Sequence, residues 1–207
     1  MPPRSENELT EPLRSHWRKA LAAIELRNSS YAISLLREIL KEEPEFLQGR
    51  QLLRRTAIAR QKAVKKSFFN TTLLSVMKAR REMRKDPKRA IEMIEDLLEN
   101  EPCHRQANLA LKEAAVAAGW LELGVFALQT LLEREPRDTR LLHELGRLYH
   151  ELGESDTEAE IYNRITEIDP TDGEAARLGR DAAALGSMKT GGWSSKATSR
   201  SSQGREV

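Results

Sequence analysis

The sequence has few of the residues on which several classes of protein depend. Cys103 is the only cysteine among 207 residues, so no disulfide can form within the chain. No apolar run approaches the roughly 20 residues that a membrane-spanning helix needs, and the first residues lack the apolar core of a signal peptide. No run of β-branched residues alternates with polar ones as in a half-buried strand. These absences favour a cytoplasmic protein that does not span a membrane and contains no sheet.

The residues that are abundant are typical of helices. Charged residues make up 32% of the chain and aromatic residues only 5%, and alanine, leucine, glutamate, arginine and lysine are all good helix formers. We therefore predict an all-α protein.

A repeat is visible in the positions of proline. Pro102, Pro136 and Pro170 close the segments LLENEP, LLEREP and ITEIDP, and successive prolines are 34 residues apart. Proline after a helix fixes the turn that follows, and a 34-residue period is typical of stacked helix–turn–helix units. A similar ending, ILKEEP, closes at Pro44 and is out of register by 24 residues. The predicted units are about 13–46, 71–104, 105–138 and 139–172.

The pattern resembles the tetratricopeptide repeat family. The last unit matches best, with Leu142, Leu145, Gly146 and Tyr149 on its first helix, followed by Gly153, Tyr162 and Pro170. The resemblance implies a right-handed superhelical solenoid of antiparallel helix pairs, with about ten helices. It also implies that Gly146 lets the two helices of a unit approach closely and that Gly153 makes the turn between them.

The other units match the family more loosely. In 71–104 we expect Met77 and Ala79 to pack in the core. Lys78 and, in 105–138, Lys112 stand at the position of the family's small residue, however, and Arg81 stands at the tyrosine position. The exact geometry of a groove is therefore not predicted by the resemblance.

The remaining segments give a domain organisation around these units. The 24 inserted residues predict one unpaired helix at about 45–66, which bends the array or separates two lobes. A helix at about 172–186 is expected to cover the open end of the stack, as repeat arrays require. The repeat domain then covers 11–186, between a disordered N-terminus at 1–10 and a disordered Ser/Gly/basic tail at 187–207.

No catalytic or metal-binding constellation stands out. His143 and His150 are seven residues apart and lack the i, i+4 spacing of a zinc-protease helix. Cys103 and His104 are adjacent in sequence, and adjacent residues do not normally face each other as a nucleophile and its base must. We expect no catalytic residue, no metal and no cofactor, and hence a protein that is not an enzyme.

The resemblance implies that the first helices of the units line a concave binding face. The candidate groove residues at these positions are Trp17, Ile24, Gln51, Arg55, Gln106, Glu113, Arg140, His143, Arg147 and His150. The family's carboxylate clamp, which holds a peptide's C-terminus with Lys, Arg and Asn, is not repeated here. The predicted function is a non-catalytic scaffold or adaptor that binds a protein or peptide segment in this groove.

Charge is strongly polarised along the chain. Residues 45–90 contain 14 lysines and arginines against three acidic residues, a net charge of +11, whereas 91–172 have a net charge of −12. At 100° per residue, five cations of the helix predicted at 45–66 fall within an arc of about 120°. This candidate basic patch comprises Arg54, Arg55, Lys62, Lys65 and Lys66. It is either a binding patch or an ordinary solvated helix face.

Two alternative functions follow from this polarity. The first is an RNA- or ribosome-associated protein that uses the basic segment 50–89. The second is a self-assembling structural protein that pairs its basic half with the acidic half of another copy. The sequence leaves open the partner's identity, the oligomeric state and the role of the tail around Trp193.

Overall fold

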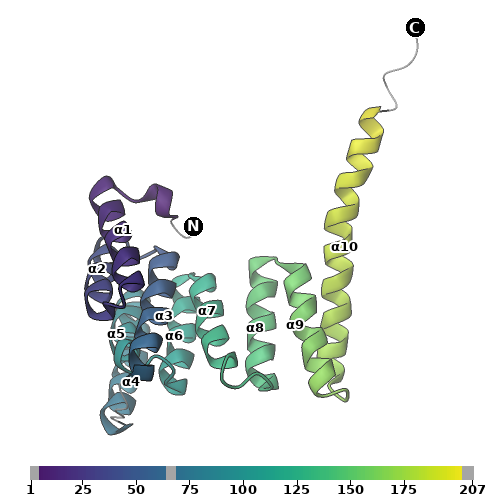
Figure 1. Ribbon diagram of the computed structural model, residues 1–207. Coiled ribbons are helices and arrows are strands. Elements are labelled where there is room, and N and C mark those ends of the chain that lie inside the picture. Colours follow the sequence, from purple (N-terminus) through teal and green to yellow (C-terminus); the bar gives the residue numbers. More distant parts are fainter. Residues whose placement is uncertain (1–4, 64–68, 202–207) are drawn as a thin grey trace. The chain divides into compact units, whose positions relative to one another are not determined.

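The chain folds into helices that follow one another through short turns (Figure 1). The computed structural model describes the backbone of residues 5–63 and 69–201 and the side chains of residues 5–61 and 73–189. The helices are η1 (Glu6–Glu8), α1 (Glu11–Glu25), α2 (Ser29–Glu42), α3 (Leu47–Ala63), α4 (Phe69–Met83), α5 (Pro87–Asn100), α6 (Arg105–Ala118), α7 (Leu121–Leu132), α8 (Thr139–Leu152), α9 (Ser155–Ile168) and α10 (Gly173–Ser201). The described residues contain ten α-helices and no strand, so the all-α prediction is confirmed.

Side-chain caps explain where several helices begin. The carboxylate of Asp86 accepts a hydrogen bond from the backbone N–H of Arg89, and Pro87 then opens α5. Asp138 accepts from the N–H groups of Arg140 and Leu141 at the start of α8. These contacts satisfy backbone donors that have no partner within the helix, and proline has no N–H to lose at this position.

The turns inside the helix pairs differ in backbone conformation. Gly119 and Gly153 both have φ +74°, in the left-handed region that glycine occupies without steric cost. The turn predicted at Gly153 is therefore confirmed. Arg27 stands at the same place in the α1–α2 turn with φ 57°, and it is the one non-glycine residue of the described chain with positive φ. Lys85, at the equivalent place in the α4–α5 turn, has no such conformation.

The chain groups into two compact units, residues 1–131 and 132–207, called the N-terminal and C-terminal units below. This grouping differs from the single repeat domain expected over 11–186. It also places the division at 131/132 and not near the inserted helix at 45–66. None of the helices in the described ranges is long and apolar enough to cross a bilayer.

The N-terminal unit contains two apolar clusters joined by α3. One cluster gathers buried side chains of α1 and α2 with Phe46, and the other gathers those of α4 to α7. Leu52 and Leu53 of α3 pack on the first cluster, and Leu47 packs on the second. The inserted helix is thus part of the core, because its apolar residues contact both clusters.

The start of the chain is more ordered than predicted. Glu6–Glu8 form a 3-10 helix, and Leu9 is only 2% exposed in the cluster of α1 and α2. The prediction of disorder over residues 1–10 is wrong for this part, because Leu9 supplies an apolar anchor that composition alone did not weigh.

In the C-terminal unit, α8 and α9 form a closely packed hairpin. Leu142, Leu145 and Tyr149 of α8 are buried. A Cβ atom added to Gly146 would lie 2.7 Å from Cζ of Tyr162, a separation that real Cβ atoms do not show. The predicted close approach of the two helices at Gly146 is therefore confirmed, and Tyr162 is the residue that requires it.

The last helix extends beyond its predicted end. We expected a capping helix at about 172–186 and a disordered tail, but α10 extends to Ser201. Lys189, beyond the expected end, donates hydrogen bonds to the carbonyl of Gly153 and the hydroxyl of Ser155. The sequence has no proline after Pro170, so nothing of that kind stops the helix where the composition becomes polar.

The helix α4 presents a different face to its neighbours than α8 does. Leu74, Met77, Lys78 and Arg81 stand 68 residues, or two repeat lengths, before Leu142, Leu145, Gly146 and Tyr149. The four residues of α8 are buried, whereas those of α4 are exposed, with Leu74 at 64% and Met77 at 61%. Val76 and Ala79 are buried instead. The expectation that Met77 packs in the core is therefore wrong.

Candidate functional site

Four predicted groove residues lie along one face of α8. Arg140, His143, Arg147 and His150 are spaced by three and four residues, which places them in one row on a helix. The hairpin residues of α8 occupy other positions and are buried. The row is thus the side of α8 that remains available, and Arg140, Arg147 and His150 are exposed.

Two residues of this row contact the segment that begins α10. Nε2 of His143 lies 2.7 Å from Oδ2 of Asp172, and Arg147 lies 3.6 Å from Glu174. The backbone N–H of Ala175 and then the His143 ring hold the pKa of Asp172 below its ordinary value. Asp172 therefore holds the ring of His143, whereas Arg147 and Glu174 form a longer, exposed ion pair.

The fourth residue, His150, contacts a buried acid. Nδ1 of His150 lies 3.1 Å from the carboxylate of Glu158 on α9, whose side chain is 4% exposed. A buried carboxylate needs a hydrogen-bonding or charged partner. Burial, followed by the nearby negative charge of Glu158, raises the pKa of Tyr162. The exposed His150 thus contacts a side chain that is buried between α8 and α9.

The groove candidates of the N-terminal unit do not form a similar row. Trp17 is buried and packs edge-on against Phe46, with ring centroids 5.0 Å apart, so its prediction as a groove residue is corrected. Glu113 pairs with Arg80 of α4 at 2.9 Å. Ile24 and Gln51 are half-buried, and Arg55 and Gln106 are exposed. The structure keeps this set and the row on α8 in separate units.

The predicted basic patch is corrected at Arg54. This side chain is 2% exposed and donates hydrogen bonds to the carbonyl of Pro102 and to Oδ1 of Asn108. Burial lowers its pKa to about 10, so it remains charged at neutral pH. Arg54 therefore anchors α3 to the turn between α5 and α6. Arg55 is exposed as predicted, while the side chain of Lys62 and the residues Lys65 and Lys66 lie outside what the structure describes.

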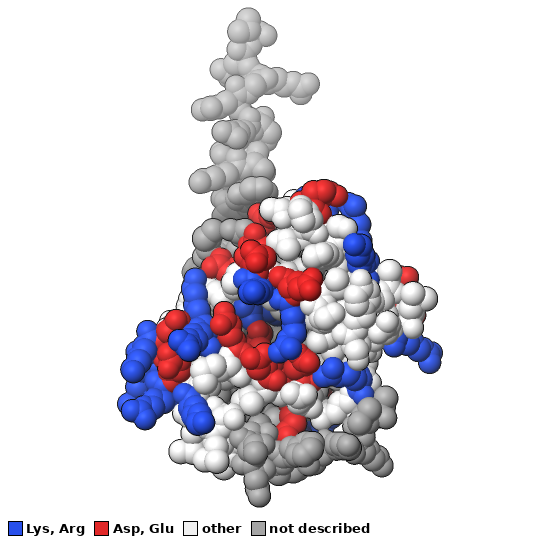
Figure 2. Space-filling model, turned by 90° about the vertical axis from the view of Figure 1, so that its left-hand side faces the viewer, with Lys and Arg blue, Asp and Glu red and all other residues white. Residues whose placement is uncertain are grey.

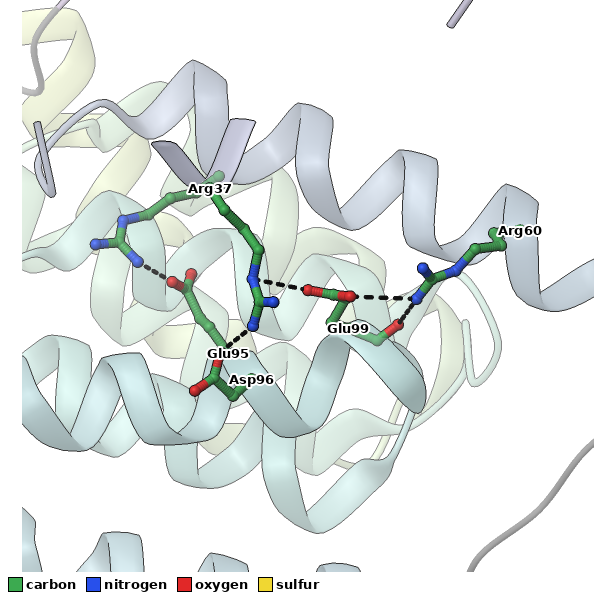
Figure 3. Close-up of polar contacts among 6 residues, drawn as sticks. Arg37, Arg60, Glu95, Asp96 and Glu99 are labelled. Atoms are coloured by element: carbon green, nitrogen blue, oxygen red, sulfur yellow. Dashed lines mark hydrogen bonds and ion pairs between the residues drawn. The ribbon is translucent and has the colours of Figure 1, made fainter. Parts of the chain in front are cut away.

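Acidic residues of α5, missed in the sequence, bind three arginines of α2 and α3. Figure 3 shows Arg37 between Asp96 and Glu99, at 2.5 and 3.0 Å, and Arg60 on the other side of Glu99. Arg50, which is almost fully buried, pairs with Glu95. All of these side chains except Arg60 line part of an open pocket of ≈ 260 Å³, together with Leu40 and Leu53. The spacing of Glu95, Asp96 and Glu99, on adjacent turns of α5, was the signal in the sequence.

These pairs divide the basic segment 50–89 into two groups. Arg50, Arg54, Arg60, Arg80 and Lys88 are bound within the N-terminal unit. The other cations of the segment whose side chains the structure describes are exposed: Arg55, Lys78, Arg81, Arg84, Lys85 and Arg89. Figure 2, which views the left-hand side of Figure 1, shows acidic and basic side chains intermingled on that face. Part of the charge polarity of the sequence is thus neutralised within one copy of the chain. Within the described residues, no group of three His, Cys, Asp or Glu side chains could hold a metal ion.

Comparison with known proteins identifies the last unit. Residues 139–172 match the family model of the tetratricopeptide repeat. No curated protein matches the chain. The chain is similar to the solved structure titled MamA MSR-1 C2, at 14% identity, covering 87% of this chain and 91% of that one, with a TM-score of 0.47. It is also similar to TTC0263, a thermophilic TPR protein of Thermus thermophilus, at 17% identity, 83% and 99% coverage and a TM-score of 0.43.

A third similar structure is MamA 41-end from Desulfovibrio magneticus RS-1. It is 15% identical, with coverage of 79% of this chain and 98% of that one and a TM-score of 0.44. The segment that matches the family model begins at Thr139, the first residue of α8, and extends past α9 to Asp172. It therefore contains the whole hairpin and the row of candidate residues on α8.

Proposed function

Since the chain carries a tetratricopeptide repeat at residues 139–172, we propose that it is a non-catalytic scaffold that binds a segment of another protein along α8. The observation that carries this proposal is the row of Arg140, His143, Arg147 and His150. Repeat proteins use the exposed faces of successive helices as extended binding surfaces. The row is such an exposed face, because the residues of α8 that pack against α9 lie at other positions of the helix.

The chemistry of the row favours a segment with acidic and hydrogen-bonding groups. Arg140 is exposed, and its guanidinium offers five donors in a planar fork that suits carboxylates. The ring of His143 is held in place by Asp172, at 2.7 Å. Side chains that are already fixed lose less conformational freedom on binding, which favours affinity.

A comparison of charge-reversal variants tests the proposal. The full chain is used as bait in three forms: wild type, Arg140→Glu/Arg147→Glu, and the control Arg180→Glu. Arg180 is exposed on α10 and lies outside the row, so the control introduces the same kind of charge reversal away from the proposed contact. Proteins bound to each bait are quantified by mass spectrometry after nuclease treatment.

The proposal expects a set of proteins that wild type and Arg180→Glu retain equally and that the α8 variant loses by about tenfold or more. Equal retention by all three baits would contradict it. Loss of the same set on nuclease treatment would favour the RNA- or ribosome-associated alternative. Retention of the chain itself as the dominant partner would favour self-assembly.

A further inference from the structure

An exposed surface on α4 combines apolar and basic side chains. We call it the α4 surface. It consists of Leu73, Leu74, Met77, Lys78 and Arg81 on α4, with Arg84 and Lys85 in the turn that follows. The three apolar side chains are each more than half exposed. Single exposed apolar residues are common on proteins, but adjacent ones indicate a contact surface.

The members of the α4 surface are neighbours because of helical spacing. Leu73 and Met77 are four residues apart, as are Leu74 and Lys78, and Arg81 lies three or four residues beyond both Met77 and Lys78. The apolar side chains occupy the earlier turns and the cations the later ones. The surface is therefore one continuous stripe that changes from apolar to basic along α4.

The cations of this stripe are unpaired, unlike others nearby. Arg80, on the same helix, pairs with Glu113. Among the described residues, by contrast, no ion pair or hydrogen bond engages the side chains of Lys78, Arg81, Arg84 or Lys85. Glu82 and Asp86 stand beside these four cations in the sequence, so the surface keeps a net positive charge, and such a surface attracts a negatively charged partner.

The residues of the stripe that lie on α4 stand at repeat positions that are buried in α8. The equivalent residues of α8 close the hairpin with α9, and Gly146 allows the contact. Lys78 stands at the position of that glycine in α4, and Ile94 of α5 stands at the position of Tyr162. Val76 and Ala79 provide another apolar side, which is buried in its place. The stripe is therefore the hairpin face of α4 turned toward the surface.

The helix dipole alone does not account for the stripe. Cations near the C-terminal end of a helix are stabilised by the helix dipole, and this applies to Arg81 and Arg84. The dipole gives no reason for Leu73, Leu74 and Met77 to be exposed in the earlier turns. Their contact with water is unfavourable, and a partner that covers them removes it.

We propose that the α4 surface binds an acidic amphipathic helix of a partner protein. The stripe extends over 13 residues, which correspond to about 18 Å, or somewhat more than three helical turns. Leucine-like side chains of the partner cover Leu73, Leu74 and Met77, and its carboxylates meet the four cations of the α4 surface. Recognition of this kind, a helix laid along an apolar surface with flanking charges, is common among helical proteins. The surface belongs to the N-terminal unit and is independent of the row on α8.

Binding of synthetic helices to the full chain tests this proposal. The probe is a fluorescent peptide of about 16 residues, long enough to cover the stripe, with leucine in the first half of one face and glutamate in the second, on an alanine background. A second probe reverses the order of the halves, since the partner's direction is open. The control peptides replace each glutamate by lysine or each leucine by serine. Fluorescence anisotropy gives the Kd at low and high salt.

Two double variants and one control locate the contact. Leu74→Asn/Met77→Asn removes apolar area, and Arg81→Glu/Arg84→Glu reverses charge. Arg134→Glu/Arg137→Glu changes two exposed arginines in the turn after α7 and serves as the control. Circular dichroism confirms that each variant keeps the wild-type helicity, which is expected because the changed side chains are exposed or half-exposed.

The proposal expects at least one glutamate–leucine probe to bind wild type and the control variant alike. Each α4 variant should raise its Kd by about tenfold or more, and both control peptides should bind more weakly. Absence of binding by both probes overturns the proposal, as does binding that neither α4 variant changes. Binding lost only with the charge variant, with single-stranded RNA competing equally, would show a purely electrostatic surface and overturn the proposed partner. Self-association that Leu74→Asn/Met77→Asn abolishes would identify a second copy as the occupant instead.

Discussion

The hairpins α8–α9 and α4–α5 are two units of the same repeat, but they bury different sides of their first helices. Their second helices agree, since Ala159 and Tyr162 of α9 and Ile91 and Ile94 of α5 are all buried. Their first helices disagree at the four equivalent positions described above. The second helix and its closing proline thus agree between the two hairpins, and the first helix differs. The residue at the close-approach position does not decide this difference alone, because Lys112 stands there in α6 while Leu111 and Ala115 are buried.

The turn between the two helices also differs between α8–α9 and α4–α5. Gly153 adopts a left-handed conformation between α8 and α9, whereas Lys85 does not between α4 and α5. A left-handed residue changes the direction of the chain in a way that ordinary residues reach only with strain. The left-handed glycine of the turn is therefore present in α6–α7 and α8–α9, whose first helices bury most of the equivalent positions, and is absent in α4–α5.

The largest expected difference is between two leucines at the same repeat position. Leu142→Ala should lower the free energy of unfolding by about 3 kcal/mol, because it leaves a cavity in a closed hairpin. Leu74→Ala should change it by less than about 0.5 kcal/mol, because Leu74 is already largely in water. Urea unfolding followed by circular dichroism measures both free energies. Similar losses would show that Leu74 is buried to the same extent as Leu142.

The next difference concerns the close-approach position. Gly146→Leu should destabilise the C-terminal unit by about 2 kcal/mol, because a Cβ atom already meets the Tyr162 ring. Lys78→Leu places the same side chain at the equivalent, exposed position of α4 and should leave stability nearly unchanged. An unaffected Gly146→Leu protein would show that α8 and α9 do not approach as closely as described.

A smaller effect is expected in the pH dependence of stability. The folded state lowers the pKa of Asp172 from its ordinary 3.8, so this carboxylate stabilises the fold above that pH, and the stabilisation is lost as acid protonates it. Asp172→Asn can keep the hydrogen bond from the N–H of Ala175 but does not titrate. Acid unfolding should therefore be steeper below about pH 4 for wild type than for Asp172→Asn. Parallel curves for the two proteins would show that Asp172 does not contribute to the acid dependence of stability.

The smallest expected effect is at the first turn. Arg27 has the left-handed conformation that glycine has at the equivalent Gly153, so Arg27→Gly relieves strain and should stabilise the fold by up to about 1 kcal/mol. The same change at Lys85 should be neutral or destabilising, because that turn needs no left-handed residue. Thermal melts of the two variants compare them directly, and a lower melting temperature for Arg27→Gly would contradict the expectation.

The features that could be predicted from the sequence are those set by the 34-residue period and by glycine. The 34-residue spacing located the second helices, and Gly146 and Gly153 marked the close approach and the turn of the last unit. The orientation of α4 was missed because the helix has apolar residues on two sides. Met77 fits the family pattern and Val76 does not, yet Val76 is the one buried.

The candidate site was predicted less completely for similar reasons. The row on α8 follows from helical spacing, and its role as a binding surface stays a prediction. Trp17 and Arg54 were assigned to a surface by their positions along a helix. However, Trp17 packs against Phe46, and Arg54 binds Pro102 and Asn108 at the α5–α6 turn. Such partners are distant in sequence, and no local pattern reveals them.

Thiol reactivity at one equivalent pair tests the central claim most directly. Met77→Cys and Leu145→Cys are made separately in a Cys103→Ser background, and the rate of reaction with a disulfide reagent is measured under native conditions. The account predicts that the thiol at position 77 reacts at nearly the rate found in denaturant. The thiol at position 145 should react more slowly by over about tenfold, because it is reached only through local opening. Equal protection at both positions would show that α4 closes its hairpin as α8 does.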